Sequence, residues 1–289
     1  MEYNVSTCDF DIRHDLIDVI HIESILERAK GEVVLETKSR NGQSAIRRLR
    51  QSGSLKCLFP RCNGDSLEAV LLNCAGGVTG GDHFSLSVQA EPGTTLTLTT
   101  QAAERIYRAL PGERGQIHTH LKVGKGARIN WLPQETILFD GCSLNRSLRI
   151  DLSEDARLLM AEPLIFGRFE MGEVLNCASI LDFIEIRRNG SPIFLERIGL
   201  QSDVQAKLNR LGIADGAHTM ASLVYVADDA DVKRDLLHQM LPRHAGVSLI
   251  QDDVLTMRLL AKDSDELRSN LVPMIKHLNK DVIPKCWII

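Results

Sequence analysis

Residues 73–82, Asn-Cys-Ala-Gly-Gly-Val-Thr-Gly-Gly-Asp, are the stretch best suited to bind a ligand. Its four glycines within six positions predict positive φ angles or the close approach of another group, since glycine otherwise costs conformational entropy. A loop of this kind cradles phosphate when a helix amino terminus and a lysine follow it. Here residues 84–88 alternate like a strand, which disfavours phosphate binding. Asp82 is therefore expected to bind a cation or, as the favoured alternative, to cap the amides of this glycine loop.

Histidines and cysteines offer a second kind of chemistry. His118 and His120 are two positions apart, so on a strand they share a face and could chelate a metal, although an exposed strand face with ordinary histidines is the favoured explanation. The seven cysteines are scattered and lack zinc-finger spacing. Cys57, Cys62 and Cys74 are expected to be buried small hydrophobic residues, and Cys74, beside the glycine loop, is also a candidate soft metal ligand.

Several carboxylates lie in segments apolar enough to be buried. Glu104, Glu135 and Asp140 are the clearest cases, and a buried carboxylate needs a charged partner or a hydrated channel. Arg105 could pair with Glu104, and a solvated loop is the alternative explanation for both glutamates. The sequence contains no P-loop, HExxH, GxSxG or dinucleotide motif, so it offers no recognisable catalytic constellation.

A repeat predicts the architecture that positions these residues. Gly93-Thr-Thr-Leu-Thr-Leu, Gly126-Ala-Arg-Ile-Asn-Trp and Asp155-Ala-Arg-Leu-Leu-Met each place a turn residue before an apolar strand, with starts 33 and 29 residues apart. Gln101 and Gln134 recur at the same offset. Repeats of about thirty residues indicate units that stack to bury their apolar faces. We therefore predict a mainly β fold: a stacked, loosely helical, β-helix-like sheet with a few helices, mostly C-terminal.

Local patterns divide the chain into three parts. Residues 1–30 form a variable N-terminal extension, with an amphipathic helix within residues 8–30. Residues 31–216 form the β-rich body, with strands at 33–37, 45–49 and 55–59 and a hairpin turn at 188–192. Residues 217–289 form a strand and helix part packed on the body in one continuous domain. Its expected elements are a strand at 220–227, a helix from Asp229 to Leu241, a hairpin around Asp252-Asp253, and a helix capped at Ser264 that Pro273 kinks or shortens.

Composition excludes several partners and compartments. The net charge of −4 argues against a nucleic-acid or membrane surface, because both favour a basic excess. Residues 1–30 lack the pattern of a secretory signal or a membrane span. An odd, scattered set of cysteines suits a reducing compartment. These features predict a cytoplasmic protein that binds neither nucleic acid nor membrane.

The chain resembles the urease accessory protein UreD family, called UreH in some organisms. The resemblance covers residues 40–289, while residues 1–30 lie outside it. Lys285 stands where the family more often has arginine, and His83, His118 and His120 are not part of the family pattern. The segments that carry the resemblance are Gly76–Asp82, Thr99–Arg108, Trp131–Gly141, Asp155-Ala-Arg-Leu-Leu, Phe166-Gly-Arg168 with Gly172-Glu173, and Pro284-Lys-Cys-Trp287.

This resemblance implies a stacked-strand scaffold, not an enzyme. It implies binding to urease apoprotein and, together with UreF and with the GTPase UreG through UreF, support of nickel delivery to the urease active site through an internal water-filled tunnel. Nickel would be a transient passenger, with no cofactor tightly bound. On this basis Asp82, Glu135, Asp140 and Glu173 are expected to line or gate a nickel path, with Cys74 as a soft contact. The C-terminal half is expected to contact UreF.

A carbohydrate-binding or hydrolytic enzyme with stacked β architecture is the alternative. Such an enzyme needs two carboxylates across an open cleft lined by aromatic side chains. Aromatic residues make up only 4% of the chain, which counts against sugar stacking.

Overall fold

The computed structural model describes residues 27–61 and 64–288. The helix predicted within residues 8–30 falls almost entirely outside these residues, and Lys30 already begins the first strand. None of the helices that the structure describes is long and apolar enough to cross a membrane.

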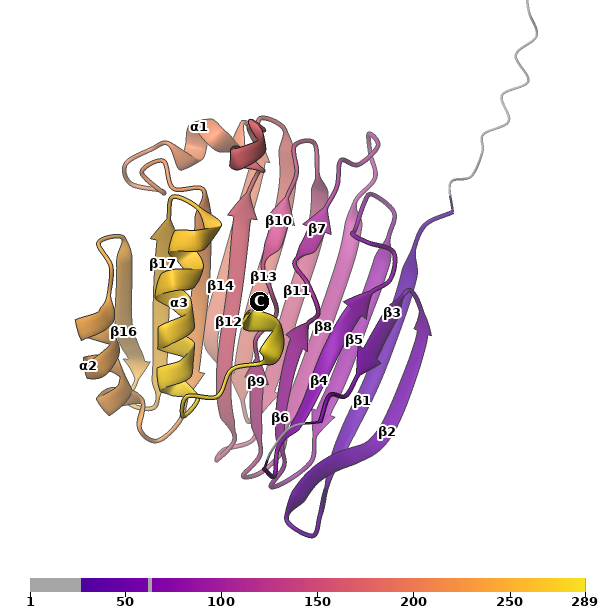
Figure 1. The fold of residues 1–289 in the computed structure, drawn as a ribbon, viewed down its shortest axis with the longest axis vertical. Coiled ribbons are helices and arrows are strands. Elements are labelled where there is room, and N and C mark those ends of the chain that lie inside the picture. The colour runs from indigo at the N-terminus through magenta and orange to yellow at the C-terminus, as the bar shows by residue number, and fades with distance from the viewer. Residues whose placement is uncertain (1–26, 62–63, 289) are drawn as a thin grey trace, which may run out of the picture.

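Most of the described chain folds into two facing sheets (Figure 1). In the described residues, sheet A has seven strands in the order β14-β13-β11-β8-β5-β1-β2 and sheet B has ten. Sheet A contains β1 (Lys30–Arg40), β2 (Gln43–Gly53), β5 (His83–Ala90), β8 (Gly115–Val123), β11 (Ser143–Leu152), β13 (Ala178–Arg188) and β14 (Ser191–Ser202). Sheet B contains β3 (Leu55–Leu58), β4 (Leu67–Asn73), β6 (Thr95–Thr100), β7 (Glu104–Ile106), β9 (Arg128–Trp131), β10 (Thr136–Leu138), β12 (Arg157–Phe166), β15 (Thr219–Val226), β16 (Ala245–Gln251) and β17 (Val254–Ala261).

The repeat predicted from the sequence matches the register in which the strands of successive coils pair. Thr95 of β6 pairs in parallel with Arg128 of β9, and Arg128 pairs in parallel with Arg157 of β12, so the offsets are 33 and 29 residues. Between these strands the chain crosses to sheet A and returns, which makes a β-solenoid of about four turns. The expected mainly β, β-helix-like architecture is confirmed.

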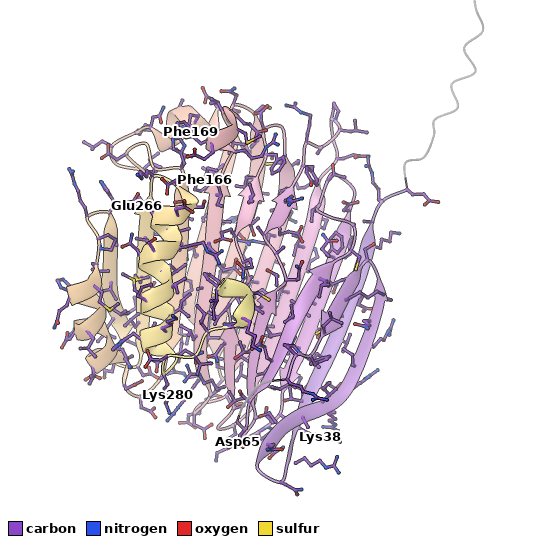
Figure 2. All side chains as sticks on the ribbon, in the orientation of Figure 1. Lys38, Asp65, Phe166, Phe169, Glu266 and Lys280 are labelled. Atoms are coloured by element: carbon purple, nitrogen blue, oxygen red, sulfur yellow. The ribbon has the colours of Figure 1, made fainter. Side chains whose placement is uncertain are left out.

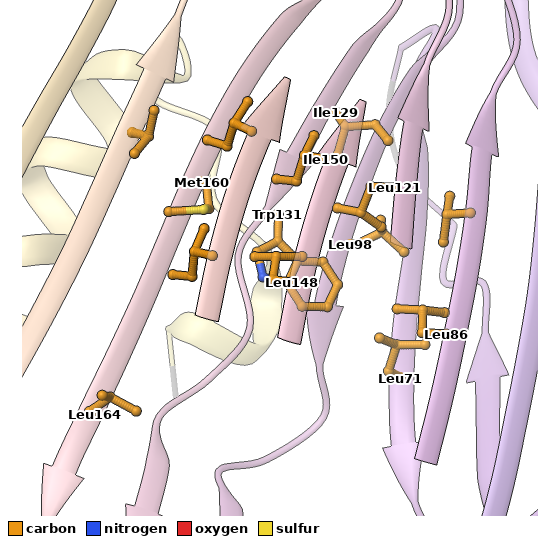
Figure 3. Packing of buried hydrophobic residues seen from close by; sticks show 14 of the residues in the cluster. Leu71, Leu86, Leu98, Leu121, Ile129, Trp131, Leu148, Ile150, Met160 and Leu164 are labelled. Atoms are coloured by element: carbon orange, nitrogen blue, oxygen red, sulfur yellow. The ribbon is translucent and has the colours of Figure 1, made fainter. Parts of the chain in front are cut away.

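Strand alternation fills the space between the sheets. Parallel strands present every second side chain to the interior, and here those side chains are apolar. Figure 3 shows Leu98, Ile129 and Met160 of sheet B facing Leu121 and Ile150 of sheet A in one cluster. All five are fully buried, so neighbouring coils stack apolar side chains on one another.

A second core lies on the outer face of sheet B. The helices α2 (Ala230–Met240) and α3 (Ser264–Leu278) and the short η2 (Lys285–Trp287) pack there, and α3 lies in front of the sheet in Figure 1. Leu267, Leu271, Ile275 and Leu278 of α3 are buried in this cluster, as predicted. The strand β15 is therefore buried on both faces, which explains its continuous apolar run.

The loops at the two opposite ends of the strands differ. Figure 2 places Phe166, at the end of β12, and Phe169 at one end, and Lys38 and Asp65 at the opposite end. The short helices η1 (Phe169–Met171) and α1 (Val204–Leu208) lie at the Phe169 end (Figure 1). The sequence patterns did not predict either of them.

The predicted hairpins are confirmed. β13 and β14 pair antiparallel around Asn189 and Gly190, which both have positive φ as a two-residue turn requires. β16 and β17 pair around Asp252-Asp253. The hairpin of β1 and β2 turns at Asn41-Gly42 in the same way.

The last helix differs from expectation in two details. Its N-cap is Asp263 rather than Ser264, because the Asp263 carboxylate accepts a hydrogen bond from the amide of Glu266 at 2.8 Å. The helix also continues past Pro273 to Leu278 rather than being shortened, since tertiary packing of its apolar face compensates for the hydrogen bond that proline cannot donate.

We expect Asp263→Ala to lower the free energy of unfolding by about 1 kcal/mol, the usual cost of losing an N-cap. Urea denaturation followed by circular dichroism measures this change. Ser264→Ala is the matched control and should have little effect; the opposite ranking would show that Ser264 is the cap.

Candidate functional site

The glycine loop joins β4 to β5 and is packed against its own chain. Gly76 and Gly81 have φ near +80°, as predicted for such a loop. A Cβ atom on Gly77 would lie 2.2 Å from the Tyr107 ring and 2.7 Å from the carbonyl oxygen of Arg105. The group that approaches the loop closely is thus the next coil of the solenoid.

Asp82 ends this loop and caps it. The side chain is 5% exposed. Its Oδ2 accepts a hydrogen bond from the amide of Thr79 and its Oδ1 accepts one from the amide of Ala29, both at 2.8 Å. These are the contacts of a capping residue, the favoured alternative for Asp82. One of them, to Ala29, reaches the chain just before β1.

Glu135 pairs with a cation from the last long helix. Arg268 of α3 donates from Nη1 to Glu135 Oε1 at 2.7 Å and to Gln134 Oε1 at 2.9 Å. From Nη2 the same guanidinium donates to the carbonyl oxygen of Trp287, and it also lies over the Trp287 ring. Gln134 Nε2 donates to the carbonyl oxygen of Cys286. The expected burial of Glu135 is correct, and its partner is Arg268.

Asp140 and Glu173 lie at the same end of the strands as Phe169, and each pairs with an arginine. Burial alone would raise the pKa of Asp140, but hydrogen bonds from the amide of Cys177 and from Arg108 outweigh it and hold the pKa below its usual value. For Glu173, hydrogen bonds from Arg168 lower the pKa. Both groups are therefore carboxylates at neutral pH with cations already bound.

A cavity of about 350 Å³ lies between the two sheets, and Cys74 lines it. The remaining four candidates, Asp82, Glu135, Asp140 and Glu173, are not among its lining residues. Glu104 is, and burial raises the pKa of this glutamate despite a hydrogen bond from Asn73. The lining also includes the buried residues Trp131, Arg146 and Glu162.

These three residues belong to a buried ionic cluster that the sequence patterns did not predict. Arg146 of β11 donates to Asp182 of β13 through Nε (2.9 Å) and Nη2 (2.5 Å), and to Glu162 of β12 through Nη1 at 2.8 Å. Trp131 Nε1 donates to the other oxygen of Glu162. Burial alone would lower the pKa of Arg146, but its two carboxylate partners raise it, so the guanidinium stays charged.

The alternation of inward and outward positions along the strands could have predicted this cluster. Arg146 lies between Leu144 and Leu148, and Asp182 lies between Ile180 and Ile184, all at inward positions of a period of two. A charged residue flanked at both i−2 and i+2 by buried apolar residues must itself point inward. The same rule applied to β12 would have found Glu162.

The histidines are arranged differently from the predicted chelate. His120 Nε2 is 2.6 Å from Asp151 Oδ2, whereas His118 Nδ1 is 2.8 Å from Ser147 Oγ. The ring next to His118 is His83, with ring centroids 5.4 Å apart. In the residues that the structure describes, no group of three or more histidine, cysteine, aspartate or glutamate side chains could hold a metal ion.

We expect Asp82→Asn to lower the free energy of unfolding by about 1–3 kcal/mol, since asparagine keeps one acceptor and leaves one of two partly buried amides without its partner. Urea denaturation measures the loss. Asp252→Asn, at an exposed turn position, is the control. Equal stabilities of the two variants would contradict the capping geometry.

Arg146→Met should lower the free energy of unfolding further, by about 3–5 kcal/mol, because it leaves Glu162 and Asp182 buried without a countercharge. Adding Glu162→Gln and Asp182→Asn should recover part of the loss. Arg197→Met, at an exposed position of β14, is the control for losing an arginine. If the triple variant were less stable than Arg146→Met, charge compensation would not explain the cluster.

Comparisons with known proteins place the chain in a family. The UreD urease accessory protein model matches residues 29–287. The urease accessory protein UreD of Ruegeria pomeroyi is 56% identical over 255 residues, which cover 88% of this chain and 99% of the relative. The proteins of the same name from Roseobacter denitrificans and Sinorhizobium medicae are 48% and 39% identical, each over 90% of this chain and 95% and 96% of their own lengths. The chain therefore belongs to the UreD family of urease accessory proteins.

Proposed function

We propose that this chain is a cytoplasmic scaffold for urease maturation. In this proposal it binds urease apoprotein and, with UreF and with UreG through UreF, supports the delivery of nickel to the urease active site. Its family and the names of its relatives support an accessory function rather than catalysis. Neither supports the alternative of a carbohydrate-binding or hydrolytic enzyme.

The internal cavity carries the proposal that nickel passes through the solenoid. A volume of about 350 Å³ has room for a hydrated ion, since one water occupies about 30 Å³ in the liquid. Cys74 and Glu104 supply a sulfur and a carboxylate at one part of the lining. Glu162 lies at another part, where its two oxygens accept hydrogen bonds from Arg146 and Trp131. Few, widely spaced ligands favour transit over storage, because a dense set of histidines and cysteines would trap the ion.

The four other candidate residues would serve this path differently. Asp82 holds two backbone amides, while Glu135, Asp140 and Glu173 each hold an arginine. Nickel could bind these carboxylates only in exchange for the present partner. Asp140 and Glu173 are the best placed for exchange, since Arg108 and Arg168 are substantially exposed and solvent can take over their charges.

We further propose that α2 contributes to the contact with UreF. Val232, Leu236 and Met240 are exposed at a spacing of four residues, so they form one apolar stripe along the helix. Exposed apolar side chains at this spacing are typical of a helix that docks in a groove of a partner. The opposite side of α2 is anchored by buried Leu237.

Narrowing the cavity should reduce nickel delivery without preventing assembly. We expect Ala103→Trp, at a residue that lines the cavity, to lower the nickel content of urease activated with UreF and UreG by several-fold. Nickel per urease is measured by mass spectrometry of the metal, and assembly by size-exclusion chromatography. Ala206→Trp, at an exposed position of α1, is the matched control. Normal nickel content with Ala103→Trp would contradict the passage of nickel through the cavity.

Charges placed on α2 should weaken binding to UreF. We expect Val232→Asp with Leu236→Asp to reduce affinity for UreF at least ten-fold, about 1.4 kcal/mol, because both charges would be desolvated in an apolar groove. Leu211→Asp, at a residue 82% exposed near α1, is the control. Calorimetry or pull-down gives the affinity, and unchanged UreF binding by the α2 variant would move the interface elsewhere.

A further inference from the structure

Two histidines meet on the outer face of sheet A. His83 of β5 and His118 of β8 lie on adjacent parallel strands, where Ser85 is the direct partner of His118. Their neighbours at alternate positions, Leu86 and Leu121, point into the core, so the two rings point away from it. The ring centroids are 5.4 Å apart and the ring planes are inclined by 56°.

The hydrogen bond of His118 prepares this ring as a ligand. His118 Nδ1 lies 2.8 Å from Ser147 Oγ, and in the tautomer in which Nδ1–H donates to this oxygen, Nε2 carries the lone pair that a metal ion needs. Metal-binding histidines usually hold their second ring nitrogen in this way, which fixes the tautomer and the ring orientation.

The separation of the rings matches tetrahedral coordination. A zinc–nitrogen bond of about 2.1 Å places each ring centroid about 3.2 Å from the metal, and a tetrahedral angle between two such rings separates the centroids by about 5.3 Å. The observed 5.4 Å agrees with this value. An octahedral right angle would need only about 4.6 Å, so the rings would have to move together.

We propose that His83 and His118 form a surface site for a divalent metal of tetrahedral preference, zinc by its chemistry, with water completing the coordination. Such a metal would link β5 to β8 across the outside of the solenoid. His120 is not part of this pair, because the ring that lies next to His118 is that of His83. His118 and Ser147 are among the residues that line the cavity. Their side chains alternate with the inward residues Thr119 and Leu148, so the site lies on the other face of sheet A and does not depend on the proposed nickel path.

Cobalt(II) tests the site, since tetrahedral Co²⁺ absorbs visible light far more strongly than octahedral Co²⁺. We expect the metal-free full-length protein to develop this intense absorption on titration with CoCl₂ and to lose it when ZnCl₂ is added. His83→Ala and His118→Ala should each abolish this signal, and Ser147→Ala should weaken it. His120→Ala is the matched control and should retain it.

A second measurement separates this site from cysteine ligands and from misfolding. A site of imidazoles and water lacks the near-ultraviolet sulfur-to-cobalt band that a cysteine site would show. ZnCl₂ should raise the unfolding temperature of the wild type and of His120→Ala, but not of the His83→Ala protein, whose far-ultraviolet circular dichroism should match the wild type. The proposal is overturned if the intense absorption is absent from the wild type, survives in both His83→Ala and His118→Ala, or comes with the sulfur band.

Discussion

Parallel pairing between successive coils is the constraint on which the rest of the structure depends. Each coil satisfies its backbone groups with the coil before and the coil after it, so a slip of one residue would turn every inward side chain outward. The turns at Gly93, Gly126 and Asp155 hold this register, and the Asp155 carboxylate accepts the amide hydrogen of Gly126. Every inward position is therefore fixed by its place in the repeat, whether its side chain is apolar or charged.

The interior departs from an optimal apolar core in one region. The cavity extends between the sheets from β4 and β5 to β11 and β12, where it meets the cluster of Arg146, Glu162 and Asp182. A void forfeits dispersion contacts, and a buried ion pair is often less stabilising than apolar residues of the same volume. Natural proteins tolerate such losses mainly at sites of function. The surrounding coils, with fully buried leucines and isoleucines, supply the stability that permits this.

Features set by local rules could be predicted from the sequence. The offsets of 33 and 29 residues, the Asn189-Gly190 turn and the apolar face of α3 follow from turn chemistry and periodicity, and each is confirmed. The partners of charged groups could not be predicted, because they come from distant coils: Glu135 meets Arg268, 133 residues away. The carboxylates of the glycine loop and of the Trp131–Gly141 segment were recognised, but burial alone does not show whether a buried carboxylate holds an amide, an arginine or an ion. The ionic cluster was accessible in principle, through charged residues at inward positions of apolar strands.

The contacts of Arg268 give the C-terminal segment an influence on the cavity. One guanidinium joins Gln134, which lines the cavity, to the carbonyl oxygen of Trp287, and Gln134 itself holds the carbonyl oxygen of Cys286. Displacing the last residues would thus remove the hydrogen bond from Gln134, in the cavity wall, to Cys286 and the one from Arg268 to Trp287. Thermodynamic linkage makes such coupling reciprocal: a protein that binds the displaced tail favours an altered wall, and a ligand that favours the altered wall strengthens binding of that protein by the same factor. In this chain Arg268 and Gln134 therefore connect the C-terminal segment to the cavity wall.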